Sequence, residues 1–294
     1  MEDRIIDCLA YDGKVSIKCI SSKEIVEKAR KIHDLTPTAS AALGRLLTIT
    51  SIMGYELKEK EGSITNQLKG DGPLGILTAV GEPNGNVKGY VVNGMVELTL
   101  NEKNGKLDVG SAVGKHGMLY IIKDLGVGTP YVGMTPIVSG EIAEDFTNYF
   151  ATSEQTPSVI ALGVLVDKNG IKSAGGYKLS LMPDATEEEI ERIENQIKNI
   201  EPISQMLDEK MTLEDIAKRV TGDENLKILA QVSPKYECNC SREKTTKNLV
   251  ALGEKELTKM IEEEEKIEIV CNFCNTKYEF TKEELKQILN DAKK

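Results

Sequence analysis

Histidine is scarce in this sequence of 294 residues. The two histidines, His33 and His116, have neither the spacing of a metal site nor a neighbouring nucleophile motif. Isolated histidines of this kind are interpreted as structural or simply exposed side chains. The sequence shows no other catalytic constellation, so we expect that the protein is not an enzyme.

Long apolar runs are also missing. The longest weakly charged run, residues 38–55, contains Arg45, five Ser or Thr residues and two glycines, which make it too polar to span a membrane. Glu2 and Asp3 follow Met1, where a secretory signal would have basic and apolar regions. We therefore expect a cytoplasmic protein without a membrane partner.

The nucleotide-binding motifs that come nearest to a match are incomplete. The stretch 110–116, Gly-Ser-Ala-Val-Gly-Lys-His, is one residue shorter than a phosphate loop and lacks the Ser or Thr that follows the lysine. The stretch 126–130, Gly-Val-Gly-Thr-Pro, does not match a dinucleotide fingerprint. Neither stretch supports a nucleotide-dependent activity.

Acidic residues outnumber basic ones in the last third of the chain. Residues 1–183 carry 19 basic and 21 acidic side chains, whereas residues 184–294 carry 18 and 26. Phosphate binding requires clusters of Lys and Arg. This balance therefore argues against a nucleic-acid partner for the last third.

Four of the six cysteines, by contrast, form two close pairs in that region. Cys238-Asn-Cys240 and Cys271-Asn-Phe-Cys274 are separated by thirty residues. Residues i and i+2 of an extended segment point to the same side, and a two-residue spacer curls a loop under a metal ion. The residues around them are mostly polar, which is unusual for buried core thiols. We therefore predict that these four cysteines hold one Zn²⁺ per chain in a closed structural site.

The Cys-x-Cys half of this motif is unusual for a zinc site. Its one-residue spacer means that oxidation could join Cys238 and Cys240 only through a small, strained ring. Strained and exposed disulfides are the labile, regulatory kind. The predicted zinc site is therefore also a candidate redox switch.

Residues 1–183 are predicted to form one α+β domain. Alternating apolar residues on either side of Asp12-Gly13 predict a hairpin with a two-residue turn, in which Cys8 faces Ile17 and lies diagonal to Cys19. Thiols stay reduced in the cytosol, so Cys8 and Cys19 are interpreted as buried core thiols.

The rest of this domain is expected to contain helices at 22–34, 39–57 (with Thr38 as the cap) and 141–150. Short apolar runs from 63 to 139, with tight turns at 71–73, 83–85 and 104–105, predict a sheet. A further hairpin is expected from 158–166 and 171–181 around Asn169-Gly170.

Residues 184–233 are predicted to form a metastable helical linker. Glutamates cover most of its first helix, and a second short helix is expected from Thr212 to Gly222. A helix with so narrow an apolar face is marginal alone and gains stability by docking on another surface. The apolar face, interpreted as a stripe that masks this surface, consists of Ile190, Ile193, Ile197 and Ile200.

Residues 234–294 are predicted to form a zinc-binding redox-switch domain. Helices are expected at 254–265 and 281–290, around the ligand loops. The expected fold class is therefore α+β, with an N-terminal sheet-and-helix domain, a helical linker and a small C-terminal zinc-binding domain.

The cysteine pattern at the end of a chain of this length resembles the 33 kDa chaperonin family. The resemblance extends along essentially the whole chain. Two small departures are Ser180, where many relatives carry Gln, and Asp184, where Gly is usual. The other matching stretches, in the family's order, are 38–45 (Thr-Ala-Ser-Ala-Ala-Leu-Gly-Arg), 106–109 (Lys-Leu-Asp-Val), 153–158 (Ser-Glu-Gln-Thr-Pro-Ser), 174–176 (Ala-Gly-Gly), 201–204 (Glu-Pro-Ile-Ser) and 270–275 (Val-Cys-Asn-Phe-Cys-Asn).

The resemblance implies an ATP-independent holdase chaperone that is activated under oxidative stress. It implies disulfides between Cys238 and Cys240 and between Cys271 and Cys274, followed by zinc release and unfolding of the C-terminal region and linker. The apolar surface exposed in this way would bind unfolding or oxidatively damaged client proteins. The resemblance further implies a homodimer in the activated state and ATP-dependent foldase chaperones as downstream partners.

Two alternatives stay open from the residues alone. A zinc ribbon that binds nucleic acid would need Lys and Arg around the metal loops. A thiol-disulfide oxidoreductase acting through Cys271 and Cys274 would need a low-pKa thiol at a helix N-terminus. An insulin-reduction assay distinguishes such an enzyme from a chaperone.

Overall fold

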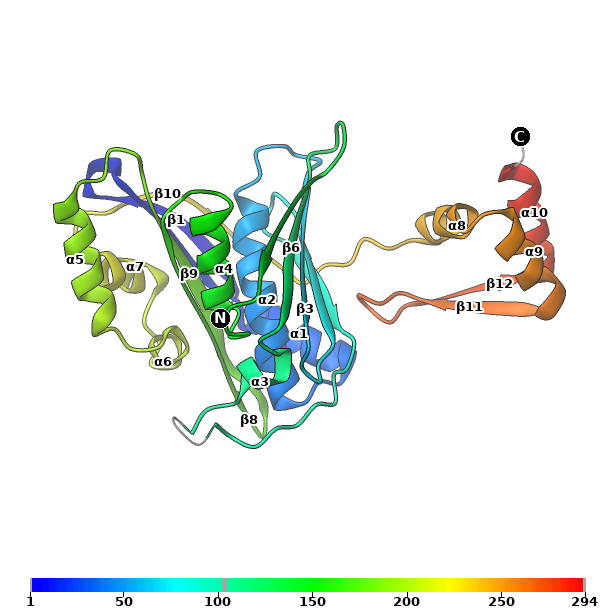
Figure 1. The fold of residues 1–294 in the computed structure, drawn as a ribbon, viewed down its shortest axis with the longest axis horizontal. Coiled ribbons are helices and arrows are strands. Elements are labelled where there is room, and N and C mark those ends of the chain that lie inside the picture. The colour runs from blue at the N-terminus through cyan, green and yellow to red at the C-terminus, as the bar shows by residue number, and fades with distance from the viewer. Residues whose placement is uncertain (1, 102–104, 293–294) are drawn as a thin grey trace. The chain divides into compact units, whose positions relative to one another are not determined.

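The computed structural model describes residues 2–101 and 105–292 (Figure 1). The chain divides into two compact units, Met1–Glu237 and Cys238–Lys294. Over the described residues, the first unit contains two five-stranded sheets and the second a two-stranded sheet. With the helices that pack on them, these sheets give the α+β fold that the sequence predicts.

Sheet A of the first unit has the strand order β10-β1-β2-β9-β8 and is antiparallel throughout. Cys8 pairs with Ile17, in the predicted register. The predicted two-residue turn is wrong, because four residues, Tyr11–Lys14, separate the paired ends Ala10 and Val15. The φ angles in this loop are positive at three successive residues, from 51° at Tyr11 to 98° at Gly13. The strands are β1 Arg4–Ala10, β2 Val15–Ser21, β8 Ser158–Asp167, β9 Gly170–Leu181 and β10 Lys227–Val232, and the loop contains the 3₁₀ turn η1 Tyr11–Gly13.

Sheet B has the order β5-β4-β3-β6-β7 and is also antiparallel. The turns predicted at 71–73 and 83–85 fall between successive strands. Asn104, part of a third predicted turn, lies outside the described residues. A short helix, α3 Val109–Val113, interrupts the long connection between β5 and β6 and was not predicted. The strands are β3 Ser63–Gly70, β4 Ile76–Gly81, β5 Val87–Val91, β6 Gly117–Asp124 and β7 Tyr131–Pro136.

Helix α2, Pro37–Tyr55, lies between the two sheets and is buried on nearly every side (Figure 1). Apart from Arg45, its residues are mostly apolar or small on every side, as expected for a helix inside a core. Thr36, not Thr38, caps this helix, because Pro37 occupies its first turn and Thr36 Oγ1 accepts from Ala39 N. The other helices of this part are α1 Lys23–His33 and α4 Ala143–Thr152.

The predicted linker packs on one face of sheet A in the first unit (Figure 1). It contains α5 Glu187–Lys198, α6 Ile203–Asp208 and α7 Leu213–Thr221, which begins after Thr212 and ends before Gly222 as predicted. The linker is not purely helical, because β10 adds a strand to the edge of sheet A beside β1. The two compact units divide between Glu237 and Cys238. The linker boundaries predicted at 183/184 and 233/234 therefore stay a prediction.

The second unit is built around a hairpin. Its helices are α8 Arg242–Ala251, α9 Glu254–Glu263 and α10 Lys282–Ala292, and its strands are β11 Lys266–Val270 and β12 Lys277–Thr281. The buried residues of its small core are Leu249, Leu257, Ile261, Phe280 and Leu285. A core of this size stabilises a fold only weakly, so such small units usually need an additional cross-link.

Candidate metal centre

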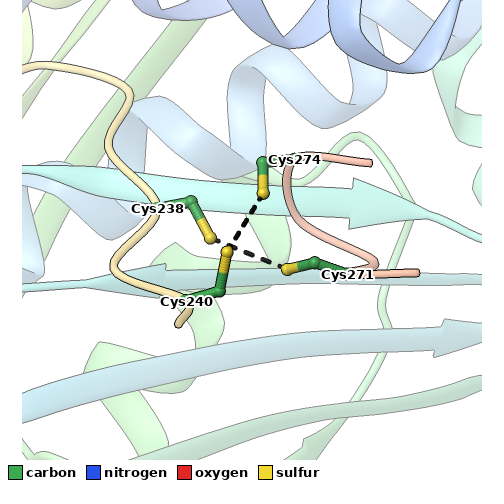
Figure 2. A group of neighbouring side chains, drawn as sticks. All are labelled: Cys238, Cys240, Cys271 and Cys274. Carbon is green, nitrogen blue, oxygen red and sulfur yellow. Dashed lines mark hydrogen bonds between the residues drawn. The ribbon is translucent and has the colours of Figure 1, made fainter. Parts of the chain in front are cut away.

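The four C-terminal cysteines lie together in the second unit (Figure 2). Cys238 and Cys240 belong to the segment that leads into α8, whereas Cys271 and Cys274 belong to the turn between β11 and β12. Hydrogen bonds from Cys271 N to Thr276 O (2.9 Å) and from Asn275 N to Cys271 O (2.8 Å) close this turn. The tight turn directs both of its sulfurs toward Cys238 and Cys240 (Figure 2).

The distances between the sulfurs suit a tetrahedral metal ion. All four Sγ atoms lie within 4.8 Å of one another. The Sγ atoms of Cys238 and Cys271 are 3.7 Å apart, and those of Cys240 and Cys274 are 3.3 Å apart. Four thiolates about 2.3 Å from one ion would be about 3.8 Å from each other, whereas a disulfide requires about 2.05 Å. The cysteines are therefore free thiols in an arrangement that could hold one metal ion.

Hydrogen bonds and burial shift the pKa values of Cys238, Cys271 and Cys274 in different directions. Burial alone would raise the pKa of Cys274, but hydrogen bonds from the Thr276 hydroxyl and backbone lower this pKa to about 7. Burial raises the pKa of Cys238 and that of Cys271. Tyr278 Oη donates to Cys240 Sγ at 3.1 Å, which raises the pKa of Tyr278 to about 12. No sequence motif marks Thr276 or Tyr278 as part of the site, although both lie within four residues of Cys274.

Arg242 connects the elements that carry the two cysteine pairs. Its guanidinium donates to Glu279 O (2.7 Å) on β12 and pairs with Glu284 (2.7 Å) on α10. The same group lies 4.2 Å from the ring centre of Phe280. These contacts hold the start of α8 against the hairpin, so they help to keep Cys238 and Cys240 near the Cys271–Cys274 turn.

The other two cysteines belong to the core of the first unit. Cys8 and Cys19 are fully buried free thiols in adjacent strands of sheet A. Burial raises the pKa of Cys8 to about 11 and raises the pKa of Cys19 well above its usual range. Because the thiolate is the reactive form, these two cysteines are poor targets for oxidants.

In the isoleucine stripe of the linker, Ile193, Ile197 and Ile200 pack in the apolar cluster on sheet A, and the members of the stripe are buried to different depths. Only Ile193 is fully buried, with 3% of its surface exposed. Ile190, Ile197 and Ile200 are half-buried. Ile193 belongs to an apolar cluster that joins the linker to sheet A, together with Ile6, Val15, Ile17, Tyr177 and Leu179 of the sheet and Ile203, Met206, Leu213, Ile216 and Val220 of α6 and α7.

Neither histidine lies in the cysteine cluster. His33 Nε2 lies 3.0 Å from Gly89 O and 3.2 Å from Tyr236 Oη, inside the first unit. The backbone N–H of His116 donates to Asp71 at 3.2 Å. In the described part of the chain, no helix combines the length and the apolar character needed to cross a membrane.

Two features bear on the alternative functions. Cys271 and Cys274 lie in a β-turn and not at the helix N-terminus that a thioredoxin-like dithiol would need. On the hairpin, Lys266 pairs with Glu279 and Lys277 pairs with Glu268. Glutamates therefore balance lysines on the hairpin next to the metal loop, which does not favour phosphate binding.

Comparisons with known proteins agree over nearly the full length of the chain. A family model described as Hsp33 protein matches residues 3–281. A 33 kDa chaperonin from Clostridium beijerinckii is 44% identical over 294 residues, which cover 100% of both chains. A second, from Alkaliphilus metalliredigens, is 44% identical over 292 residues, which cover 99% of this chain and 100% of the relative. A crystal structure of the 33 kDa chaperonin from Thermotoga maritima superposes with a TM-score of 0.89 at 39% identity and covers 99% of each chain.

Proposed function

Because the chain belongs to the Hsp33 family of chaperones, we propose that it is an ATP-independent holdase that oxidation of its four clustered cysteines activates. The observation that carries this proposal is the set of four free thiols within 4.8 Å of one another in a unit with a small core. We place this function in the cytosol, where thiols stay reduced until an oxidant arrives.

In the resting state, Cys238, Cys240, Cys271 and Cys274 would hold one Zn²⁺. When bound, such an ion keeps its ligand sulfurs deprotonated and cross-links the segments that carry them. Metal binding in small domains is worth roughly 10–16 kcal/mol, which exceeds what so small an apolar core supplies. The four cysteines therefore act as the main cross-link of the second unit.

Oxidation removes this cross-link by changing the ligands. Each pair of thiolates loses two electrons to one peroxide molecule, takes up two protons in the process, and yields one disulfide and two waters. The proposed pairs are Cys238 with Cys240 and Cys271 with Cys274, neighbours along the chain. Local disulfides of this kind no longer hold α8 to the hairpin, so the second unit unfolds.

Client binding would then use the surface that the linker covers. Sheet A and helices α5–α7 share one apolar cluster, so release of the helices exposes a large apolar face. Exposed faces of this size are typical sites of protein–protein contact. Unfolding proteins, a second activated copy of the chain and, later, ATP-dependent foldases are the partners that the proposal includes.

The test compares reduced and peroxide-treated protein in one set of samples. We expect one zinc per reduced chain, and after peroxide we expect loss of zinc, loss of four free thiols and suppressed light scattering by an unfolding client. Cys271→Ser should abolish tight zinc binding, whereas the control Cys8→Ser with Cys19→Ser should behave like the unmodified chain. Undiminished zinc in Cys271→Ser, or oxidation without client binding, would contradict the proposal.

A further inference from the structure

The last residues of the first unit close the edges of both of its sheets. This segment, Lys227–Glu237, is called the strap here. Its first part is β10, which pairs with β1 at the edge of sheet A. Its last part forms a parallel bridge between Tyr236 and Val87, at the start of the edge strand β5 of sheet B. One continuous segment is therefore attached to both sheets.

Residues Lys235–Glu237, called the latch, are bound to sheet B through their backbone. Val87 N donates to Lys235 O, and Glu237 N donates to Val87 O, both at 3.0 Å. The side chain of Asn86 binds the same residues, since its Oδ1 accepts from Lys235 N at 2.9 Å and its Nδ2 donates to the carboxylate of Glu237. Lys28 Nζ donates to Tyr236 O at 2.9 Å.

The side chain of Tyr236 anchors the latch in the core. Only 3% of its surface is exposed, and it packs in the main apolar cluster of the first unit. Its hydroxyl donates to Gly89 O at 2.8 Å. Because a buried aromatic ring contributes a large apolar area, removal of the latch from sheet B is costly.

The two ends of the strap differ in how firmly they are held. The side chains of β10 are largely exposed, with Ile228 at 50% and Leu229 at 57%. Main-chain hydrogen bonds to β1 therefore provide most of its attachment, whereas the latch has a buried anchor as well. The firmly held end lies next to the cysteines, because Cys238 directly follows Glu237.

This arrangement has a consequence for the order of events. Along the chain, the masking helices α5–α7 come first, the strap second and the cysteine unit third. A loss of order that begins at the cysteines must therefore pass the latch and then β10 before it reaches α7. From this order and these contacts we infer that the latch is a gate in the switch, which delays release of α5–α7 after the cysteine unit has unfolded. The inference rests on the proposed function and names the residues that regulate it.

The test is Asn86→Ala in the full chain, with Tyr236→Phe as a second, milder variant that keeps the buried ring. The matched control is Asn148→Ala, which also loses a side-chain hydrogen bond, from its amide to Thr135, in the same unit but away from the strap.

After peroxide, we expect zinc and thiol loss at unchanged rates in all variants, because the latch includes no cysteine. Amides of α7 should exchange hydrogen about tenfold sooner in Asn86→Ala, since two hydrogen bonds to the latch are lost together. Tyr236→Phe should show a smaller change in the same direction, and Asn148→Ala none.

Hydrogen exchange separates failure of the gate from failure of the proposed function. If the amides of Lys235 and Glu237 exchange faster in Asn86→Ala but α7 is released at the unmodified rate, the latch is not a gate. If α7 is released as expected but no variant suppresses client aggregation, the gate stands and the holdase function is wrong.

Discussion

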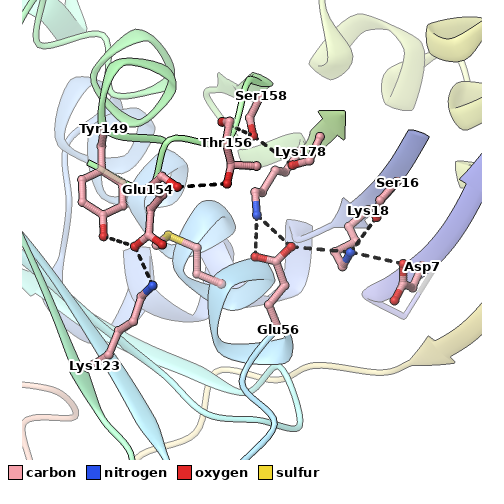
Figure 3. A network of polar contacts seen from close by, with 12 residues as sticks. Asp7, Ser16, Lys18, Glu56, Lys123, Tyr149, Glu154, Thr156, Ser158 and Lys178 are labelled. Atoms are coloured by element: carbon pink, nitrogen blue, oxygen red, sulfur yellow. Dashed lines mark hydrogen bonds and ion pairs between the residues drawn. The ribbon is translucent and has the colours of Figure 1, made fainter. Parts of the chain in front are cut away.

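Lys178 is the most deeply buried cation of a polar network at the inner side of sheet A (Figure 3). Its Nζ lies 2.7 and 2.8 Å from the two carboxylate oxygens of Glu56 and 4.1 Å from the ring centre of Phe150. Lys18 reaches Glu56 at 3.5 Å and Asp7 at 3.3 Å, so the charges alternate along the network. Burial lowers the pKa of Lys178, and the paired carboxylate opposes this effect.

The two partners of this ion pair should not be equally sensitive to replacement. Glu56→Gln leaves the Lys178 cation buried without a counter-charge, which should cost about 3 kcal/mol of unfolding free energy. Lys178→Met removes the buried charge and keeps the packing volume, while Glu56 still has Lys18, so its cost should be about 1 kcal/mol or less. Urea titrations of both variants measure the difference. Equal losses of unfolding free energy in the two variants would show that the unpaired buried cation is not the main cost of Glu56→Gln.

Asp3 is a second buried ionisable group, and its side chain contacts the start of α1. Its carboxylate accepts from Ile25 N at 2.7 Å and Glu24 N at 3.2 Å, and only 4% of the residue is exposed. Burial raises its pKa from 3.8 to about 7 despite these hydrogen bonds. The unfolded chain therefore ionises Asp3 at lower pH than the folded chain does. The folded state loses stability as pH rises from about 4 to about 7.

Asp3→Asn should remove this pH dependence. Relative to the unmodified chain, the variant should gain stability between pH 4 and pH 7, by at most about 4 kcal/mol for a pKa shift of this size. The measurement is urea unfolding at several pH values, followed by tyrosine fluorescence. The control is Asp12→Asn, the same substitution at an exposed position in the loop after β1. A stability difference between Asp3→Asn and the unmodified chain that stays constant with pH would mean that Asp3 is not buried as a neutral acid.

At the scale of elements, the regularly spaced isoleucines of α5 are buried to very different extents. Thr186 and Glu189 form a capping box at its start, and Lys14 pairs with Glu189 at 2.7 Å. The remaining glutamates of its first turns face solvent, so docking depends on the apolar stripe. Within that stripe, Ile193 alone reaches the buried cluster completely.

Ile193→Ser should therefore release the linker more effectively than Ile190→Ser. Loss of one fully buried isoleucine removes roughly 1.5–3 kcal/mol of docking free energy, whereas a half-buried one removes less. We expect Ile193→Ser, alone or with Ile190→Ser, to suppress client aggregation while zinc stays bound and the cysteines stay reduced. Ile190→Ser serves as the matched control on the same helix. A linker that exchanges hydrogen freely in Ile193→Ser without client binding would show that the client surface lies elsewhere.

At the scale of the whole molecule, the two largest apolar clusters of the first unit have different roles. The larger one surrounds α2 between the two sheets, whereas the second is shared between sheet A and α5–α7. Removal of the residues after Asp184 would take only Tyr236 from the larger cluster and would expose the sheet A side of the other. The chain that remains contains β1, β2, β8 and β9 of sheet A and all of sheet B.

A chain that ends at Asp184 should therefore fold and hold clients without an oxidant. Far-ultraviolet circular dichroism checks its fold, and light scattering of an unfolding client checks its activity. We also expect it to be prone to self-association, because its exposed face is apolar. A folded but inactive truncated chain would contradict the idea that the linker masks the client surface.

The features that the sequence by itself determined about this protein are mostly local, because each depends only on residues a few positions apart in the chain. The Cys-x-Cys and Cys-x-x-Cys spacings predict the four-sulfur cluster, since each pair is positioned by its own local backbone. The register of the first hairpin and the limits of α7, from Thr212 to Gly222, were predicted for the same reason. The predicted length of the turn after β1 was wrong, because three successive positive φ angles leave no distinct pattern in the side chains.

The tertiary structure alone decided which distant segments meet and how deeply they are buried. Residues 227–232 carry no alternating pattern, yet they form β10, because the open edge of β1 supplies hydrogen-bond partners. Nothing in the sequence around Tyr236 indicates that its side chain is buried, yet the structure places it in the main apolar cluster of the first unit. Lys235 meets Asn86 across 149 positions of sequence. Contacts of this range depend on the packed arrangement of both sheets, since a short stretch of sequence specifies its own conformation but not its partner.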